Sequence, residues 1–154
     1  MQKNKQVEGK ARLQYGALPY RIRDDDMQVM LVTSRETRRW IIPKGWPMKH
    51  RKPHASAKRE AFEEAGVVGA IGKRAIGTYS YDKRLKSDAT VTCKVKVFPL
   101  EVRAELKQWP ERDQRQGRWF SPDEAAGAVE EDGLGEIIRK LRDQVSSRPT
   151  ASAA

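Results

Sequence analysis

The segment at residues 59–66, REAFEEAG, places three carboxylates within five positions, at Glu60, Glu63 and Glu64. In a helix, residues three and four positions apart are neighbours, so the three acids would share one face. At an effective dielectric of about 20, two carboxylates roughly 6 Å apart repel each other by about 2–3 kcal/mol. On a fully solvated face that cost falls to about a few tenths of a kcal/mol, which a surface helix tolerates. The spacing is therefore compatible with a solvated acidic face and with a cation site, and the flanking residues must decide between them.

The residues around these acids predict a helix from about position 53 to position 65. At about 100° per residue, Ala57, Ala61 and Ala65 form one narrow apolar arc, separate from the arc that carries the acids. Small alanines on the buried side allow a helix to lie close against a sheet. Pro53 suits the first helical turn, and Gly66 suits the position just past the helix end. The acidic segment is thus expected on a helix packed against a sheet.

Runs of β-prone residues precede and follow this helix. They lie at 13–22, 27–35, 38–43, 75–83, 90–102 and 117–121, while the charged stretch at 103–117 reads as irregular. Ser121 and Pro122 signal the start of another helix, and an amphipathic helix closes the chain with one apolar side made of Leu134, Ile137, Ile138 and Leu141. These elements predict one α/β domain at 11–145, a flexible N-terminus at 1–10 and a disordered tail at 146–154.

The composition limits the classes of function. Of the 154 residues, 38% are hydrophobic and 34% charged, and no apolar run approaches the length of a membrane span. The start of the chain lacks the apolar core of a signal peptide, and a single cysteine excludes an internal disulfide and a cysteine-based zinc site. We therefore expect a cytoplasmic location and no membrane partner. The formal charge of +10 predicts an anionic partner, and its spread along the chain argues against a nucleic-acid-binding arm.

The segment from Gly45 to Val67 resembles the signature of the Nudix hydrolases. In that signature a glycine is followed at a fixed distance by Arg-Glu-aliphatic-x-Glu-Glu-x-Gly-aliphatic, and this chain has REAFEEAGV at 59–67. The resemblance implies an α/β/α sandwich built on a mixed β-sheet, and hydrolysis of phosphoanhydride bonds with Mg²⁺ or Mn²⁺ as cofactor. It further implies that Glu60, Glu63 and Glu64 bind the metal together with a backbone carbonyl near Gly45. Hard divalent cations prefer such oxygen ligands, and a bound cation would relieve the repulsion among the acids.

Two residues of the signature have expected supporting roles, and one position departs from the family pattern. Arg59 is four residues from Glu63 and is expected to orient that carboxylate, while Gly66 ends the helix. Arg51 stands six residues after Gly45, where the family has a glutamate. The change removes a negative charge near the metal, and the arginine could instead meet a substrate phosphate. The number of bound metal ions is therefore left open.

Over residues 12–142 the resemblance narrows to the diphosphoinositol polyphosphate phosphohydrolase branch. Three runs carry it: RRWIIPKGWPM, WPE at residues 109–111 (the WPE segment) and RQGRWFSPDEA. This branch implies a polyphosphorylated small-molecule substrate, either a diphosphoinositol polyphosphate or a dinucleoside polyphosphate. Such substrates need several cationic contacts. The expected substrate-binding residues are Lys44, Arg35, Arg38, Arg39 and Arg51, from a wider set of candidates that also holds Arg21, Lys49, Lys83 and Arg115. Lys44 is favoured because it immediately precedes the glycine of the signature.

The sequence does not fix the identity of the general base or the substrate. The expected catalytic residues are Glu63, Glu64 and Glu111; Glu64 is the first choice for the base, and Glu111 in the WPE segment is the second. Glu101 and Glu105 remain alternatives. The rival functions are pyrophosphate removal from RNA 5′ ends, sanitising of mutagenic nucleotides, and a non-catalytic nucleotide- or RNA-binding module. RNA is the less favoured partner, and the sequence does not fix the oligomeric state.

Overall fold

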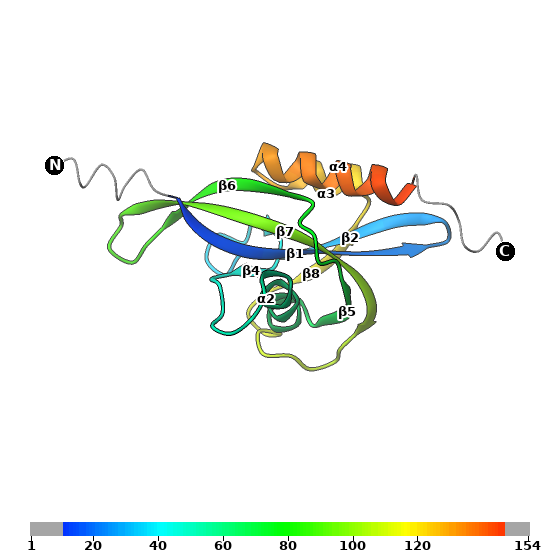
Figure 1. The fold of residues 1–154 in the computed structure, drawn as a ribbon, viewed down its shortest axis with the longest axis horizontal. Coiled ribbons are helices and arrows are strands. Elements are labelled where there is room, and N and C mark those ends of the chain that lie inside the picture. The colour runs from blue at the N-terminus through cyan, green and yellow to red at the C-terminus, as the bar shows by residue number, and fades with distance from the viewer. Residues whose placement is uncertain (1–10, 147–154) are drawn as a thin grey trace.

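A computed structural model describes residues 11–146, which form a mixed eight-stranded sheet with helices on both faces (Figure 1). The strands are β1 (Arg12–Arg23), β2 (Asp26–Thr33), β3 (Trp40–Ile41), β4 (Lys44–Gly45), β5 (Val67–Ile71), β6 (Gly77–Arg84), β7 (Thr90–Glu105) and β8 (Gly117–Phe120). The helices are α2 (Pro53–Glu60), a π-helical turn η1 (Ala61–Ala65), α3 (Pro122–Ala128) and α4 (Asp132–Ser146).

Two long strands, β1 and β7, lie parallel to each other at the centre of the sheet. Their register pairs Arg12 with Cys93 and Tyr20 with Glu101. Five strands follow the order β3-β2-β1-β7-β5; β4 pairs with β1, β6 with β7, and β8 with β2. All of these other pairings within residues 11–146 are antiparallel. The short strand β4, which carries Gly45, is thereby attached to the centre of the sheet.

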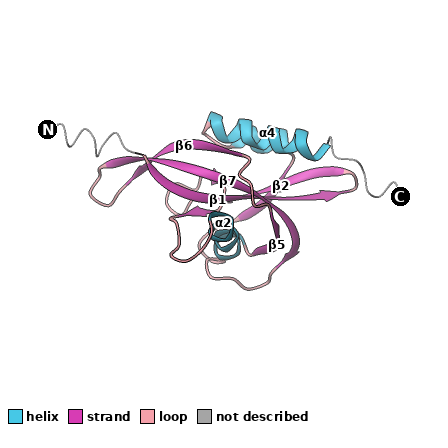
Figure 2. Cartoon of the chain, in the orientation of Figure 1, coloured by secondary structure: helices cyan, strands magenta, loops and turns pink. Residues whose placement is uncertain are grey.

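The alternation of side chains along β1 divides the core between the two faces of the sheet. Leu18 packs with Leu134 and other residues beneath α4, whereas its neighbour Ala17 packs with Ala57 and Ala61. Figures 1 and 2 show the result, with α3 and α4 on one face and α2 on the other. The small alanines allow the acidic helix to lie close to the sheet, as the sequence predicted.

The architecture expected from the sequence is confirmed. Helices cover both faces of a mixed sheet, which is the predicted α/β/α sandwich. Ser121 caps α3 through a capping box, in which its side chain accepts a bond from the Glu124 N–H and the Glu124 carboxylate accepts one from the Ser121 N–H. The closing helix buries the four predicted residues Leu134, Ile137, Ile138 and Leu141.

Three features of the fold differ from the expectation. Strand β5 was not predicted, because its sequence VVGAI is short and contains Gly69 at a shift of register against β7. Strand β7 extends to Glu105, into the stretch expected to be irregular, because β5 pairs with its end. The helix expected at 53–65 is α-helical only as far as Glu60 and continues as η1.

The two ends of the chain lie largely beyond what the structure describes. The predicted flexible N-terminus at 1–10 and residues 147–154 of the predicted tail lie outside the described residues, while Ser146 belongs to α4. Among residues 11–146, no helix is long and apolar enough to cross a membrane.

Candidate functional site

Helix α2 and the turn η1 carry the three acids of the signature. The helix begins at Pro53, where the missing N–H of proline costs nothing because the first turn has no acceptor for it. After Glu60 the chain widens into the five-residue π turn η1, which holds Glu63 and Glu64 and ends at Gly66 with a φ of 68°. Single π turns within helices are frequent at functional sites.

Glu60 and Glu64 are buried beside strand β4, with 9% and 6% of their surface exposed. The Lys44 N–H donates a hydrogen bond to Oε1 of Glu64 at 3.3 Å. At the next residue, Gly45, an added β-carbon would overlap the carboxylate of Glu60. A residue without a side chain at this position therefore allows the Glu60 carboxylate to lie against the backbone of β4.

Burial raises the pKa of both carboxyl groups. Removal from water is the largest cause at Glu64, whose pKa rises to about 8, and the charges of Glu60 and Glu111 act in the same direction. The guanidinium of Arg115 opposes this rise. At Glu60, burial and then the charge of Glu63 raise the pKa. At Glu64, burial therefore outweighs the positive charges of Arg115 and Lys44.

Glu63 is oriented differently from the other two acids. Its Oε2 accepts a 2.7 Å hydrogen bond from Nε of Arg59, and 28% of its side chain is exposed. The structure thus brings Glu60 and Glu64 together and holds Glu63 on the neighbouring arginine. Within the described residues, no three His, Cys, Asp or Glu side chains are already arranged as the ligands of a metal ion.

The guanidinium of Arg115 lies among three oxygen groups. Its Nε donates to Oε1 of Glu111 at 2.8 Å, and its Nη1 donates to the carbonyl oxygen of Thr33 at 3.2 Å. Its Nη2 lies 3.7 Å from Oε2 of Glu64, and the Arg115 side chain is 9% exposed. The N–H of Glu111 also donates to the carbonyl oxygen of Glu63 at 2.9 Å. Glu111, the second candidate base, is therefore brought to the same arginine as Glu64.

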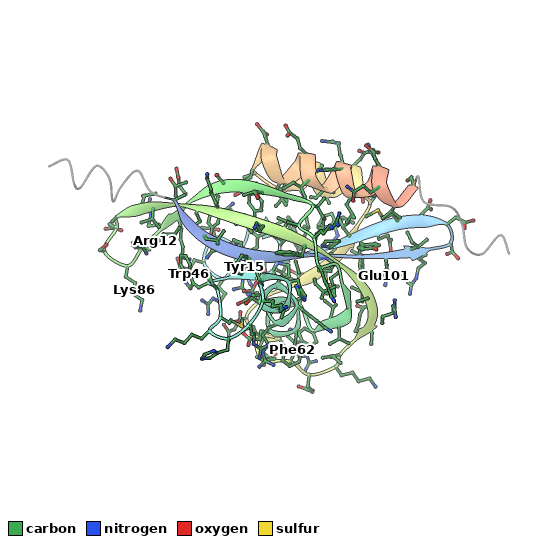
Figure 3. The ribbon with its side chains drawn as sticks, viewed as in Figure 1. Arg12, Tyr15, Trp46, Phe62, Lys86 and Glu101 are labelled. Carbon is green, nitrogen blue, oxygen red and sulfur yellow. The ribbon has the colours of Figure 1, made fainter. Side chains whose placement is uncertain are left out.

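The other two candidate bases, Glu101 and Glu105, lie away from the carboxylates of Glu60 and Glu64. Glu101 lies opposite Tyr20 in the register of β7 with β1, whereas Gly45 lies opposite Tyr15. Figure 3 accordingly shows Glu101 away from Tyr15 along the sheet. Glu105, farther along β7, pairs with an arginine of β1 at 3.2 Å.

The side chain of Lys44 lies on the face of the sheet that carries α4. Lys44 is opposite Gly16 in the register of β4 with β1, and its Nζ is 4.9 Å from the centroid of the Tyr81 ring. Loss of contact with water lowers the pKa of Lys44 to about 8, although the charges of Glu64 and Glu131 counteract this change. The residue favoured as a phosphate contact is therefore half-buried in this structure.

The other four expected substrate-binding cations lie on two loops. Arg35 and Arg38, in the loop between β2 and β3, contact the side chain and the carbonyl of Gln114 at 3.1 and 3.4 Å. Arg39 ends that loop and pairs with Glu131, between α3 and α4, at 2.8 Å. The fourth, at position 51, is exposed in the loop before α2. Arg35, Arg38 and Arg39 therefore share the loop between β2 and β3, while Arg51 lies apart from them in the loop before α2.

Two contacts that build the site were missed in the sequence. The ion pair between Arg115 and Glu111 had an available signal, since the two residues are four positions apart. The contact between Trp109 and Gly66 had none: an added β-carbon on Gly66 would overlap the indole ring, so the ring lies directly over this glycine. Together these contacts attach the WPE segment to η1.

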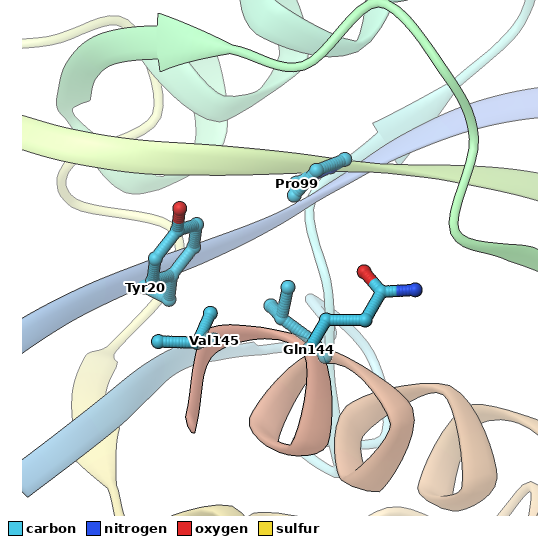
Figure 4. Close-up of a pocket in the computed structure, with 5 residues that line it drawn as sticks. Tyr20, Pro99, Gln144 and Val145 are labelled. Atoms are coloured by element: carbon cyan, nitrogen blue, oxygen red, sulfur yellow. The ribbon is translucent and has the colours of Figure 1, made fainter. Parts of the chain in front are cut away.

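A small recess elsewhere on the molecule is separate from the acids. It lies between the sheet and the C-terminal part of α4 and is lined by Tyr20, Pro99, Leu141, Gln144 and Val145 (Figure 4). Because α4 covers the face opposite α2, this recess contributes nothing to the carboxylate cluster.

The donor atoms of the cluster fit a hard divalent cation. Glu60, Glu63, Glu64 and the carbonyl of Gly45 offer oxygen atoms, which are the ligands that Mg²⁺ and Mn²⁺ prefer. The raised pKa values of the buried pair show that a positive charge beside it would stabilise the ionised forms. The missing side chain at position 45 leaves that space to carboxylate oxygens.

Known proteins share both the sequence pattern and the fold. A NUDIX domain family model matches residues 13–141. Nudix hydrolase 13, mitochondrial, of Arabidopsis thaliana is 29% identical over 163 residues, which cover 92% of this chain and 81% of that protein. Diphosphoinositol polyphosphate phosphohydrolase 3-alpha of Mus musculus is 31% identical over 110 residues, which cover 70% of this chain and 63% of that protein.

Among solved structures, a binary complex of C. elegans Ap4A hydrolase superposes with a TM-score of 0.67 and 18% identity, over 90% of this chain and 100% of that one. At this identity the likeness shows the fold. The family match spans nearly the whole described domain and includes both strand β4 and the acidic helix. The chain therefore belongs to the Nudix hydrolases, a family of pyrophosphohydrolases that act on phosphoanhydride bonds.

Proposed function

We propose that this Nudix hydrolase cleaves a phosphoanhydride bond in diphosphoinositol polyphosphates or dinucleoside polyphosphates, with Mg²⁺ or Mn²⁺ as cofactor. The observation that carries the proposal is the buried pair of Glu60 and Glu64 against the backbone of Gly45. Two buried carboxylates with raised pKa values are costly for the fold unless a cation joins them. A buried carboxylate pair of this kind is suited to metal-assisted hydrolysis and does not help to stabilise the fold.

The three acids of the signature, with the carbonyl of Gly45, would hold the cation. A bound divalent cation polarises a phosphoryl oxygen and lowers the pKa of a bound water. Arg59 keeps Glu63 in one orientation through their 2.7 Å bond. The Lys44 N–H orients the carboxylate of Glu64 in the same way at 3.3 Å.

We assign to Glu64 the acceptance of a proton from the attacking water, with Glu111 as the second candidate. A general base must lie within reach of the proton that it accepts, and Glu64, as one of the residues that would hold the cation, would lie beside a water bound to it. Glu111 shares the guanidinium of Arg115 with Glu64 and keeps 22% of its side chain exposed. It is thus the more accessible of the two carboxylates to water.

The substrate class is proposed from the charge of the chain and from its relatives. Substrates with many phosphates gain from each cation that they meet, and the formal charge is +10. The matched mouse protein is named as a diphosphoinositol polyphosphate phosphohydrolase, and the superposed structure as an Ap4A hydrolase. Lys44, Arg35, Arg38, Arg39 and Arg51 remain the proposed phosphate contacts. A cytoplasmic location also remains a proposal, since the matched Arabidopsis protein is named as mitochondrial.

Phosphate release from a panel of substrates tests the assignment. The panel contains inositol pyrophosphates, dinucleoside polyphosphates, nucleoside triphosphates and 5′-triphosphorylated RNA, each with Mg²⁺ and with Mn²⁺. We expect the highest kcat/KM for the first two classes. The preference should shrink with added salt, because exposed charges are screened beyond about 8–10 Å near physiological ionic strength.

The control for the panel is Glu64→Gln, which should lower turnover by about two or more orders of magnitude because an amide is a poor ligand for Mg²⁺. A variant that keeps full activity would show that the measured hydrolysis does not use this site. Nucleoside triphosphates hydrolysed as efficiently as the polyphosphates, at low and high salt alike, would contradict the substrate class and leave the hydrolase intact.

A further inference from the structure

We propose that Arg115 is a positioning residue that holds Glu111 in place and, until a divalent cation binds, supplies positive charge beside Glu64. The inference rests on the proposed metal-dependent hydrolysis and assigns a role to a residue outside the family signature. Arg115 lies in the loop before β8, and its side chain reaches back to Glu64 in the turn η1.

Each of the three guanidinium nitrogens of Arg115 faces a different oxygen group. Nε is bonded to Glu111 at 2.8 Å and Nη1 to the carbonyl of Thr33 at 3.2 Å. These two bonds fix the plane of the guanidinium, because its donors form a rigid fork. A lysine has one ammonium group and would not reach both partners and Glu64 in the same geometry.

The contact of Arg115 with Glu64 is an ion pair without a hydrogen bond. Nη2 is 3.7 Å from Oε2 of Glu64, which is an ion-pair distance but too long for a hydrogen bond. Arg115 therefore attracts Glu64 through charge without fixing it by a bond. When a cation approaches, the carboxylate of Glu64 can turn to it while the two hydrogen bonds of Arg115 persist. The guanidinium and the cation are thus competitors for one carboxylate.

The burial of Arg115 separates this role from substrate binding. Its side chain is 9% exposed, so little of the guanidinium is left to meet a phosphate. Arg112, in the same loop, is exposed; its guanidinium donates a 3.5 Å bond to Gln108 and lies 6.0 Å from the centroid of the Trp109 ring. It provides a matched control, since its replacement removes the same charge from the same loop without touching the acids.

Binding of Mn²⁺ to the substrate-free protein, followed by electron paramagnetic resonance of the free ion, tests the charge role. Arg115→Gln should bind Mn²⁺ on the order of threefold to tenfold more tightly than the wild type, because the competing charge is gone. Arg115→Lys should stay close to the wild type, since it keeps the charge. Arg112→Gln should also match the wild type. Unchanged or weaker binding by Arg115→Gln would overturn the charge role.

Steady-state kinetics at saturating Mn²⁺ test the positioning role. Arg115→Gln and Arg115→Lys should both lower kcat, on the order of 10- to 100-fold, because Glu111 is no longer held. The KM for substrate should change little in either variant. A large rise in KM with kcat retained would show instead that Arg115 binds the substrate. If Arg115→Gln does not fold, the lysine variant still decides this point through kcat and KM.

The Mn²⁺ measurement also separates this inference from the proposed function. It needs no substrate, so it remains decisive if the wild type hydrolyses none of the compounds in the panel. The converse outcome is an active wild type whose Mn²⁺ affinity is the same as that of Arg115→Gln. That result would support the proposed hydrolysis and refute the inference about Arg115.

Discussion

At position 45, the absence of a side chain determines where the carboxylate of Glu60 can lie. The same backbone segment provides the N–H that bonds Glu64, so one short strand sets the positions of two acids. Strand β4 is only two residues long, yet its pairing with β1 fixes its distance from the helix. The signature glycine is therefore explained by close contact and not by an unusual backbone angle, since its φ is not in the left-handed region.

Replacing this glycine gives a prediction that separates metal binding from stability. In Gly45→Ala, the new methyl group should displace the carboxylate of Glu60, which is the flexible end of a side chain. The free energy of unfolding should change by less than about 1 kcal/mol. The affinity for Mn²⁺ should fall by about tenfold or more, because the displaced oxygen is no longer in place.

Chemical denaturation and Mn²⁺ titration measure the two effects. Gly127→Ala is the control, since an added β-carbon at Gly127 has no neighbour within 4 Å. It should leave Mn²⁺ affinity unchanged. Wild-type Mn²⁺ affinity in Gly45→Ala would mean that Glu60 does not contribute to the metal site.

Among the elements, the π turn η1 and the WPE segment depend on each other. Gly66 ends η1 with a φ of 68°, and the ring of Trp109 lies over it. Gly66→Ala should therefore destabilise the protein by about 1–3 kcal/mol, through backbone strain and displacement of the ring. It should also lower kcat, because the moved segment carries Glu111.

Urea unfolding and steady-state kinetics check this prediction. Gly117→Ala is the comparison, because an added β-carbon there meets its nearest atom, the sulfur of Met30, at an ordinary 3.6 Å. If Gly66→Ala costs no more stability than Gly117→Ala, the ring does not depend on a bare backbone at Gly66.

The elements that sequence predicted well are those with a strong local pattern. The spacing of Ala57 and Ala61, the cap at Ser121 and the apolar side of α4 each depend on residues within a few positions. The elements that the sequence did not predict depend on pairing with residues far away in the chain. The tail of β7 is a strand because β5 pairs with it, and β5 itself was hidden by Gly69.

The same distinction applies to the site. The three acids and the contact of Arg59 with Glu63 were expected from their spacing, but that spacing does not show that the helix widens after Glu60. The position of Lys44 on the other face follows from the pairing of β4 with β1, which has no local signal in so short a strand. The assignment of metal and substrate contacts therefore stays a prediction.

For the whole molecule, the acidic cluster links stability to pH and to metal. Burial raises the pKa of Glu64 from 4.5 to about 8 in the folded protein. The folded state thus holds this proton more tightly than the unfolded state, so the contribution of Glu64 to stability is complete below about pH 4.5. It is lost as the pH rises through about 8. Metal-free protein should accordingly become less stable between pH 6 and pH 9, relative to Glu64→Gln.

Divalent cations should reverse this trend, because they bind the deprotonated carboxylates. The increase in Tm on adding Mg²⁺ should be larger at pH 9 than at pH 6 in the wild type, and small at both in Glu64→Gln. Thermal unfolding in EDTA and in Mg²⁺ measures it. The same Mg²⁺ effect at both pH values would refute the link to Glu64.

The parallel pairing of β1 with β7 has a consequence for how the protein is made. The register joins Arg12 to Cys93, so the first strand emerges from the ribosome long before its central partner. Contacts between residues so distant in the chain carry a high loop-closure cost and slow the folding of a domain. A nascent chain that ends before residue 90 has β2 and β4 to pair with β1 but not β7. Completion of the sheet therefore belongs to the later part of synthesis, and the metal site is assembled on a sheet whose centre closes late.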